Sequence, residues 1–132
     1  MGQQSKYLNC YPDTMPGDND LCFVAKASTN YGGFTVLAAY AVTGAVGTLD
    51  LVLQNYGATG TVAGGTVAGH ASGTAAVWAA DTPQTLTITA ANAFIDSGEW
   101  LVLKKTESAA GNDLTADALV HIEYVDGVVT QG

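Results

Sequence analysis

Hydrophobic and polar residues alternate along most of the chain from residue 21 onward, with a period of two rather than that of a helix. Segment 84–89 shows this most clearly, because Leu86 and Ile88 fall on one face and threonines on the other. The same alternation occurs in segments 34–42, 48–54 and 118–125. It predicts that these residues face inward: Phe34, Val36, Ala38, Tyr40, Val42, Leu49, Leu51, Leu53, Val120, Ile122 and Tyr124. His121 and Glu123 would then face outward. Such alternation predicts β-strands that cover a core with one face.

Other parts of the chain complete this pattern. Segment 99–104 is apolar on both faces, as in a strand covered on two sides. A shorter strand candidate lies at 22–27, and weaker ones lie at 61–68 and 73–79. Turn signals rich in Gly, Asn and Asp separate the candidates, at 31–33, 43–44, 55–57, 96–98, 111–113 and 126–127. No stretch predicts a strong amphipathic helix, although a short helix or turn is expected at 90–94. About eight short strands predict an all-β fold, an antiparallel, jelly-roll-like β-sandwich.

The first 21 residues differ from the rest. Pro12 and Pro16 stand among acidic residues and disfavour both a continuous helix and a central strand. We therefore expect residues 1–21 to form an extended N-terminal arm and residues 22–132 to form the sandwich domain. The apolar residues of the arm are too scattered for a core of their own. They are the candidate partner-binding residues Tyr7, Leu8, Tyr11 and Met15.

Composition and charge restrict the classes of function. The 132 residues fit one domain, and 48% of them are hydrophobic, which argues against intrinsic disorder. Four Lys and Arg residues against twelve Asp and Glu give a net charge of −8, so we expect neither nucleic acid nor an anionic membrane as partner. The chain has a polar start and no apolar run of transmembrane length. We therefore expect a protein made in the cytoplasm.

Motifs that would carry catalysis are incomplete. Segment 64–71 superficially resembles a phosphate loop, but His70 and Ala71 stand where Lys and Ser or Thr are required. Ser72 comes one place too late for a nucleophile elbow. Because no constellation has catalytic spacing, we expect the protein not to be an enzyme and to use no cofactor.

Metal-binding residues also lack the usual spacing. Cys10, Cys22, His70 and His121 form no Cys-x-x-Cys-like pair. Two acidic clusters offer oxygen ligands for Ca²⁺ but match no EF-hand loop: Asp13, Asp18 and Asp20, and Asp113 and Asp117. We therefore expect no metal site. The sequence leaves open whether the two cysteines are free thiols or form a bridge that ties down the N-terminal segment.

The C-terminal third carries a family resemblance. The strand-like segment 84–89 is followed by the phrase Ser97-Gly98-Glu99-Trp100-Leu101, a polar loop and the closing strand 118–125. This order resembles the capsid decoration, or cement, proteins of tailed bacteriophages, over residues 34–126. The resemblance implies a jelly-roll-like sandwich without catalytic residues. It also implies a homo-oligomer, in this family often a trimer, that binds the outer surface of the major capsid protein lattice and stabilises it on the virion.

Two other roles remain open at the level of sequence. The chain could be a receptor- or carbohydrate-binding module of a phage fibre, in which exposed aromatic residues stack on sugar rings. The candidates for such stacking are Trp78, Trp100, Tyr31 and Tyr56. It could also be another component of head or tail assembly.

Overall fold

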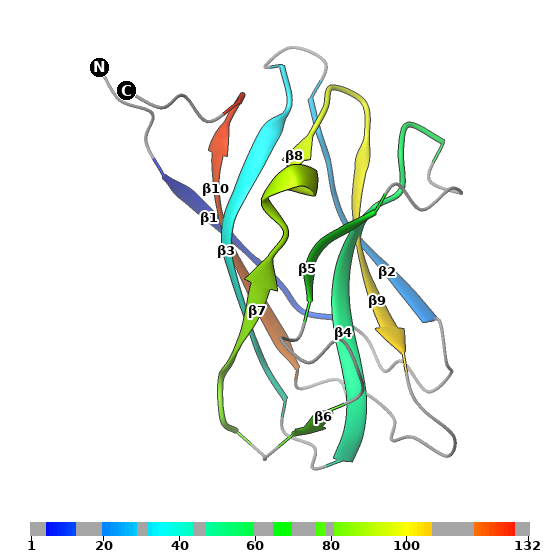
Figure 1. Cartoon of the computed structure of the whole chain (residues 1–132), viewed down its shortest axis with the longest axis vertical. Helices are drawn as coiled ribbons and strands as arrows, with labels where there is room; N and C mark the ends of the chain where they lie inside the picture. The colour runs from blue at the N-terminus through cyan, green and yellow to red at the C-terminus, as the bar shows by residue number, and fades with distance from the viewer. Residues whose placement is uncertain are drawn as a thin grey trace.

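The computed structural model is an antiparallel β-sandwich, as the alternation predicts (Figure 1). It describes residues 5–12, 20–28, 32–43, 47–59, 65–69, 76–78, 81–106 and 118–128. The elements in chain order are β1 (Lys6–Cys10), β2 (Asp20–Lys26), β3 (Phe34–Val42), β4 (Gly47–Asn55), β5 (Thr66–Gly69), β6 (Ala76–Trp78), β7 (Gln84–Ile88), η1 (Ala90–Asn92), β8 (Phe94–Ile95), β9 (Trp100–Thr106) and β10 (Leu119–Asp126). The element η1 is one 3-10 turn in the region where a short helix is expected.

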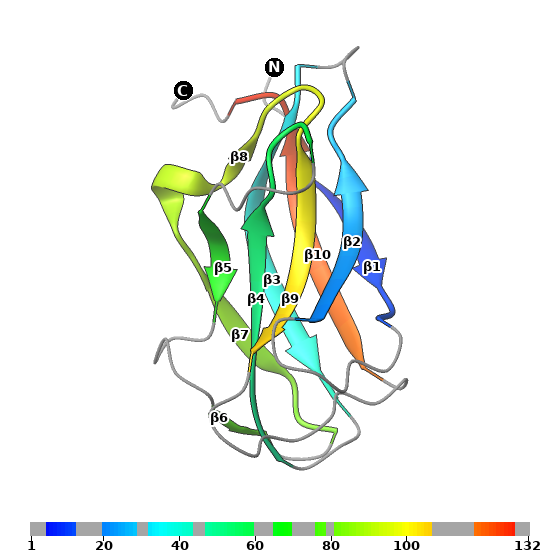
Figure 2. The same ribbon diagram turned by 90° about the vertical axis from the view of Figure 1, so that its right-hand side faces the viewer.

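The strands form one hydrogen-bonded path that folds into two layers. The order is β1-β10-β3-β7-β5-β4-β9-β2, while β6 pairs with β4 and β8 pairs with β3. Strand β7 joins the layers because it pairs with β3 on one side and with β5 on the other. Figure 2 shows β5 and β7 on the left of the sandwich and β1 and β2 on the right. The path therefore begins and ends on the side opposite β7.

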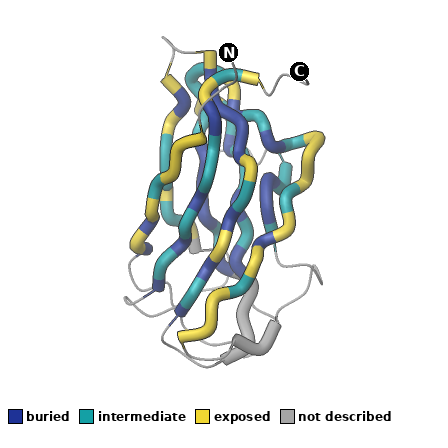
Figure 3. The backbone as a smooth tube through the Cα atoms, turned by 90° about the vertical axis from the view of Figure 1, so that its left-hand side faces the viewer, coloured by how far each residue is buried: buried dark blue, intermediate teal, exposed yellow. Residues whose placement is uncertain are grey.

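The core lies between the layers and follows the predicted alternation in most strands. Along β4, Leu51 and Leu53 are fully buried, and along β7 Leu86 is buried between exposed threonines. Along β10, Val120 and Ile122 are fully buried. Figure 3 shows the resulting change between buried and more exposed positions along the strands. The side chain of Leu49 lies outside the described residues.

Strand β3 departs from the prediction. Phe34 and Val36 are buried as expected, but beyond them Ala39 and Ala41 are buried and Tyr40 is exposed. The register with β10 shifts at this point, because Glu123 faces Ala38 and Tyr124 faces Val36, which leaves Leu37 as an extra residue. Such a β-bulge moves every later side chain to the opposite face. The inward placement predicted for Ala38, Tyr40 and Val42 is therefore wrong.

Strand β9 is covered on both faces, as the sequence predicts. Leu101, Val102 and Leu103 are all fully buried. The side chain of Lys105 is also fully buried, at the same face of the strand as Leu101 and Leu103.

The turn before β9 gives a structural role to Gly98 and Glu99 of the phrase Ser97-Gly98-Glu99-Trp100-Leu101. Oε1 of Glu99 accepts hydrogen bonds from Asn55 Nδ2 and from the backbone N–H of Asp96, both at 2.9 Å. The backbone N–H of Gly57 donates to Asn55 Oδ1 at 2.7 Å. Gly57 and Gly98 adopt positive φ angles in the two turns. The Glu99 carboxylate thus connects two predicted turns that lie more than 40 residues apart in sequence.

The N-terminal segment is extended, as expected, and part of it belongs to the sheet. Strand β1 pairs antiparallel with β10, with Leu8 opposite Ile122, and Leu8 packs against the core. Strand β2 begins at Asp20 and pairs with β9. Residues 13–19, which include Met15, lie outside the described residues. The boundary between arm and domain at residue 21 stays a prediction.

Candidate functional site

The side of the sandwich between β1 and β2 is the first candidate site, and we call it the seam. Among the described residues, β1 pairs only with β10, and β2 pairs only with β9. Side chains rather than a backbone ladder therefore connect the two edge strands. The sulfur atoms of Cys10 and Cys22 lie 3.9 Å apart across the seam. Burial and the neighbouring Cys22 raise the pKa of the Cys10 thiol to about 12.

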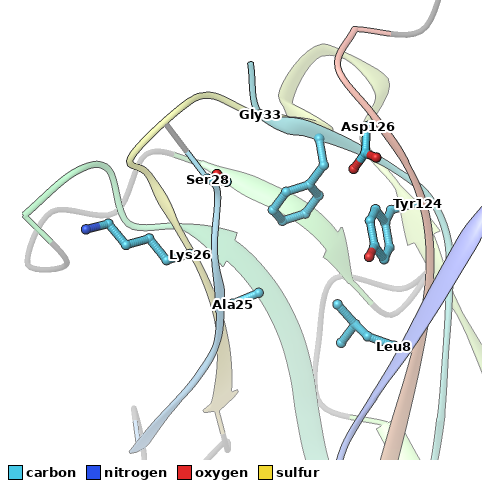
Figure 4. A pocket seen from close by; sticks show the side chains of 8 residues that line it. Leu8, Ala25, Lys26, Ser28, Gly33, Tyr124 and Asp126 are labelled. Atoms are coloured by element: carbon cyan, nitrogen blue, oxygen red, sulfur yellow. The ribbon is translucent and has the colours of Figure 1, made fainter. Parts of the chain in front are cut away.

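A pocket opens elsewhere along the seam (Figure 4). Its volume is about 180 Å³, and its lining residues come from both layers: Leu8, Ala25, Lys26, Ser28, Gly33, Phe34, Tyr124 and Asp126. The Phe34 and Tyr124 rings meet edge to face at 5.4 Å. Lys26 extends away from the pocket. Because small-molecule sites span roughly 300–1,000 Å³, this pocket fits one apolar side chain of a partner better than a whole ligand.

Charged groups lie at one rim of the pocket. The Lys6 ammonium forms an ion pair with the Asp126 carboxylate, which connects the start of β1 to the end of β10. Both side chains are about half exposed, at 50% and 46%, so water screens the pair. Asp126 is itself one of the lining residues, so the pocket combines an apolar wall with one paired carboxylate.

The outer face of β1, β10 and β3 is the second candidate site. His121 lies between two tyrosines, with ring centroids 5.4 Å from Tyr7 and 6.2 Å from Tyr40. Asn9 Oδ1 lies 2.7 Å from His121 Nδ1, and Glu123 Oε2 lies 4.0 Å from His121 Nε2. The Asn9 side chain and the imidazole are thus within hydrogen-bond distance, and the tautomer of His121 sets which group donates. We call these three rings the outer aromatic row.

A shallow apolar groove continues from this row. It has a volume of about 210 Å³ and is lined by Tyr40, Ala41, Val42, Pro83, Leu119 and His121. The β-bulge at Leu37 creates this surface, because it turns Tyr40 outward beside His121. The groove and the row together form an apolar surface that joins β1, β10 and β3.

The outer face of β2 carries a third group of apolar side chains. Leu21 and Phe23 are 41% and 48% exposed. The Phe23 ring packs edge-on against Trp100 at 5.5 Å and against Tyr56 at 6.3 Å. Lys26 Nζ lies 5.5 Å from the centre of the Trp100 ring. This edge strand therefore exposes apolar surface on the same side of the sandwich as β1.

The predicted partner-binding residues separate in the structure. Tyr7 and Tyr11 are each 69% exposed, whereas Leu8 is half-buried and lines the seam pocket. Met15 lies outside the described residues. The outward placement predicted for His121 is confirmed, with 33% of its side chain exposed, but sequence reasoning missed Phe23 and Tyr40 as surface aromatic residues. Their signal is weak, because Tyr40 and Phe23 stand in apolar runs that look buried throughout.

Of the four aromatic residues expected to stack on sugar rings, the two with described side chains do not form an exposed platform. Tyr56 is only 7% exposed, and Trp100 is half-buried under Phe23. Tyr31 and the side chain of Trp78 lie outside the described residues. The outer aromatic row is instead a described surface to which three neighbouring rings contribute.

Neither a metal-binding cluster nor a membrane-spanning helix occurs in the part of the chain that the structure describes. There, no three His, Cys, Asp or Glu side chains gather closely enough to hold a metal ion. The acidic residues considered for Ca²⁺, apart from the backbone of Asp20, lie outside the described ranges. So do His70 and Ser72. None of the described helical segments has the length and apolar character that a membrane span needs.

Comparison with known proteins adds little. No protein-family model and no curated protein matches the chain. It is similar to a chain in the structure of infectious bursal disease virus Gx strain, with 9% sequence identity and a TM-score of 0.34. The similarity covers 95% of this chain and 40% of that chain. At these values the likeness concerns overall β architecture at most.

Proposed function

We propose that the protein is a structural virion protein that binds the outer surface of a bacteriophage capsid and stabilises the lattice of the major capsid protein. The observation that carries the proposal is the concentration of exposed apolar side chains on the two edge strands and just beside them. Tyr7 and Tyr11 lie in and after β1, and Leu21 and Phe23 lie in β2. Exposed apolar side chains on open edge strands are typical of a protein-binding surface.

The edge strands also suit binding through the backbone. A strand that is paired on one side only presents N–H and C=O groups on its other side, to which a partner strand can add. The seam pocket lies between these two edges and can take an apolar side chain of that partner. Backbone pairing and one apolar anchor together favour a protein partner.

The composition supports a structural role. Only 12% of residues are charged, which limits the desolvation cost when a large surface is buried. The net charge of −8 disfavours binding to packaged DNA and to anionic membranes. Attachment in many copies to a repeating lattice makes a modest affinity at each site sufficient. The proposal accordingly includes neither catalysis nor a cofactor.

The test is binding to expanded, DNA-free capsids of the virus that encodes the chain. We expect the protein to co-sediment with them and to raise their melting temperature. The double variant Tyr7→Ser, Tyr11→Ser removes two exposed rings, so the sandwich should still fold while capsid affinity falls at least about tenfold. Thr85→Ser with Thr87→Ser changes exposed residues on β7 and serves as the matched control. Equal binding by both double variants would contradict the role of the edge strand.

The oligomeric state is tested separately. We propose a homo-oligomer, with a trimer favoured, because capsid surfaces offer three-fold positions. Light scattering coupled to size-exclusion chromatography should then give about three times the monomer mass of 13.4 kDa. A monomer at all concentrations that still binds capsids would remove the trimer from the proposal and leave capsid binding in place.

The outer aromatic row favours one alternative, a carbohydrate-binding module. The row consists of three rings that lie next to one another in space, on three strands: Tyr7, His121 and Tyr40. The polar groups of Asn9 and Glu123 lie beside the His121 ring. Aromatic rings with nearby amide and carboxylate groups are suited to binding the apolar face and hydroxyls of a sugar. Binding on a glycan array that is lost in Tyr40→Ala would favour this alternative over capsid binding.

A further inference from the structure

The two cysteines of the chain meet where the hydrogen-bonded path of strands is open. Cys10 ends β1, and Cys22 lies near the start of β2. These strands are the two ends of the strand order, and among the described residues neither forms a ladder with the other. The sulfur atoms nevertheless lie 3.9 Å apart, with both thiols reduced. The cysteines therefore provide a side-chain contact between two edges that lack a backbone connection.

We propose that Cys10 and Cys22 form an intramolecular disulfide by exchange with a low-molecular-weight disulfide such as oxidised glutathione, and that this bond closes the seam. The sulfur atoms must approach by roughly 1.9 Å to reach the usual S–S length of about 2.05 Å. Small shifts of the edge strands suffice for this movement, because no ladder holds the facing backbones at a fixed spacing in the described part of the chain. Metal binding is the other common role of paired thiols, but no third ligand lies beside them among the described residues.

The order of the two exchange steps follows from the unequal exposure of the two thiols. Cys22 is partly exposed and Cys10 is buried in the core cluster, so the oxidant meets Cys22 first. The Cys22 thiolate attacks one sulfur of oxidised glutathione, forms a mixed disulfide and releases one glutathione thiolate. Cys10 then loses its proton and attacks the Cys22 sulfur, which releases the second glutathione. Overall, two protein thiols are oxidised to one disulfide and one oxidised glutathione is reduced to two molecules of the thiol.

The disulfide bond would both stabilise the folded chain and hold the edge strands β1 and β2 together. It closes a short loop, because the two residues are separated by 12 positions in sequence. A loop of this size restricts the unfolded chain enough to raise the melting temperature of a domain this large by on the order of 10 °C. It would also hold β1 against β2, since each of these strands otherwise depends on a single ladder in the described structure.

The experiment uses the purified full chain and glutathione alone. After equilibration with oxidised glutathione, we expect the intact mass to fall by two hydrogen atoms and the thiol count in denaturant to fall from two to zero. The melting temperature should rise by on the order of 10 °C and return after treatment with dithiothreitol. Cys22→Ala is the matched control, because it leaves the buried Cys10 in place and should show no redox-dependent shift.

Two outcomes would overturn the proposal. One is a protein that keeps both thiols, or ends as a glutathione adduct or a disulfide-linked dimer, under conditions that oxidise free cysteine. The other is an internal disulfide that leaves the melting temperature unchanged or lowers it, because the bond would then not stabilise the closed seam. These measurements involve no capsid, so their outcome is independent of the proposed function.

Discussion

The two sides of the sandwich connect its layers in different ways. On one side, β7 donates and accepts backbone hydrogen bonds with both β3 and β5, so one strand belongs to both layers. On the other side, β1 and β2 face each other across the seam without a ladder between their described residues. The first side is joined by backbone pairing, and the second is joined by the side chains of the core and the two cysteines.

Because of this difference, the continuous backbone pairing lies on one side of the sandwich and the accessible apolar surface lies on the other. The β7 side presents threonines to solvent and buries Leu86, as expected for a strand that is paired on both sides and covers the core with one face. The seam has half-paired edge strands, exposed apolar rings and a pocket. Edge strands that remain open invite further pairing, so natural proteins usually protect them. In this chain the seam is therefore the side where the proposed partner would bind with the least rearrangement.

The largest expected effect tests whether the β7 side dominates stability. Leu86→Ala removes a side chain that is 1% exposed and lies opposite Ala39 of β3, so we expect a loss of about 2–5 kcal/mol in the free energy of unfolding. Leu8→Ala makes the same change in half-buried β1 and should cost only about 1–2 kcal/mol. Urea unfolding of both variants measures the difference. Equal losses would show that the β7 side and the seam contribute equally to the free energy of unfolding.

The next effect concerns Gly33, which lines the seam pocket where β3 begins. It has a φ angle of +85°, and a Cβ added there would overlap the backbone oxygen of Ile95 and lie 3.0 Å from the Phe94 ring. We expect Gly33→Ala to lower the free energy of unfolding by about 2–3 kcal/mol through backbone strain and this overlap.

The neighbouring glycine provides the control for that change. Gly32 also has a positive φ angle, of +70°, but an added Cβ would meet nothing within 4 Å. Gly32→Ala should therefore cost only the backbone strain, about 1 kcal/mol. If the two variants lose equal stability, the packing of β8 against the start of β3 is looser than the structure indicates.

The sequence predicts the strands better than it predicts their arrangement. Alternation identifies the inward residues of β4, β7 and β10 because these strands pair without interruption where the residues lie, as at Leu51, Leu86 and Val120. It fails in β3, since every residue from Phe34 to Val42 except Thr35 is apolar and nothing in the sequence marks Leu37 as the extra residue of a bulge. The exposure of Tyr40, and with it the outer aromatic row, depends on that single residue.

The seam could not be predicted from local pattern. The pairing of β1 with β10 joins residues more than 100 positions apart, such as Asn9 and His121. Periodicity describes the face of a strand but carries no information about which strand becomes its neighbour. The sequence therefore left the state of Cys10 and Cys22 open. Their closeness arises because the path of strands folds into two layers, which brings its two end strands, β1 and β2, to the same side (Figure 2).

A smaller effect follows from the Cys10 thiol of the reduced protein. Folding raises its pKa from 9.0 to about 12, so the folded state keeps a proton that the unfolded state loses above pH 9. This contribution to stability is fully present below pH 9 and is lost as pH rises toward 12. We expect wild-type protein in reductant to lose up to about 1 kcal/mol per pH unit within this window, relative to Cys10→Ala. Parallel pH profiles of the two proteins would contradict the burial of Cys10 at the seam.

The smallest expected effect concerns the ion pair at the rim of the seam pocket. Lys6 and Asp126 are about half exposed, so Lys6→Ala should change the free energy of unfolding by only about 0.2–1 kcal/mol, and less at high salt. Its local effect should be larger than its global one, because Lys6 lies at the free end of β1, where few other contacts hold the strand. Hydrogen exchange should therefore show faster opening of the β1 amides while those of β7 remain unchanged. Faster exchange in both strands would mean that the seam and the β7 side open as one cooperative unit, and that the contrast between them concerns geometry rather than stability.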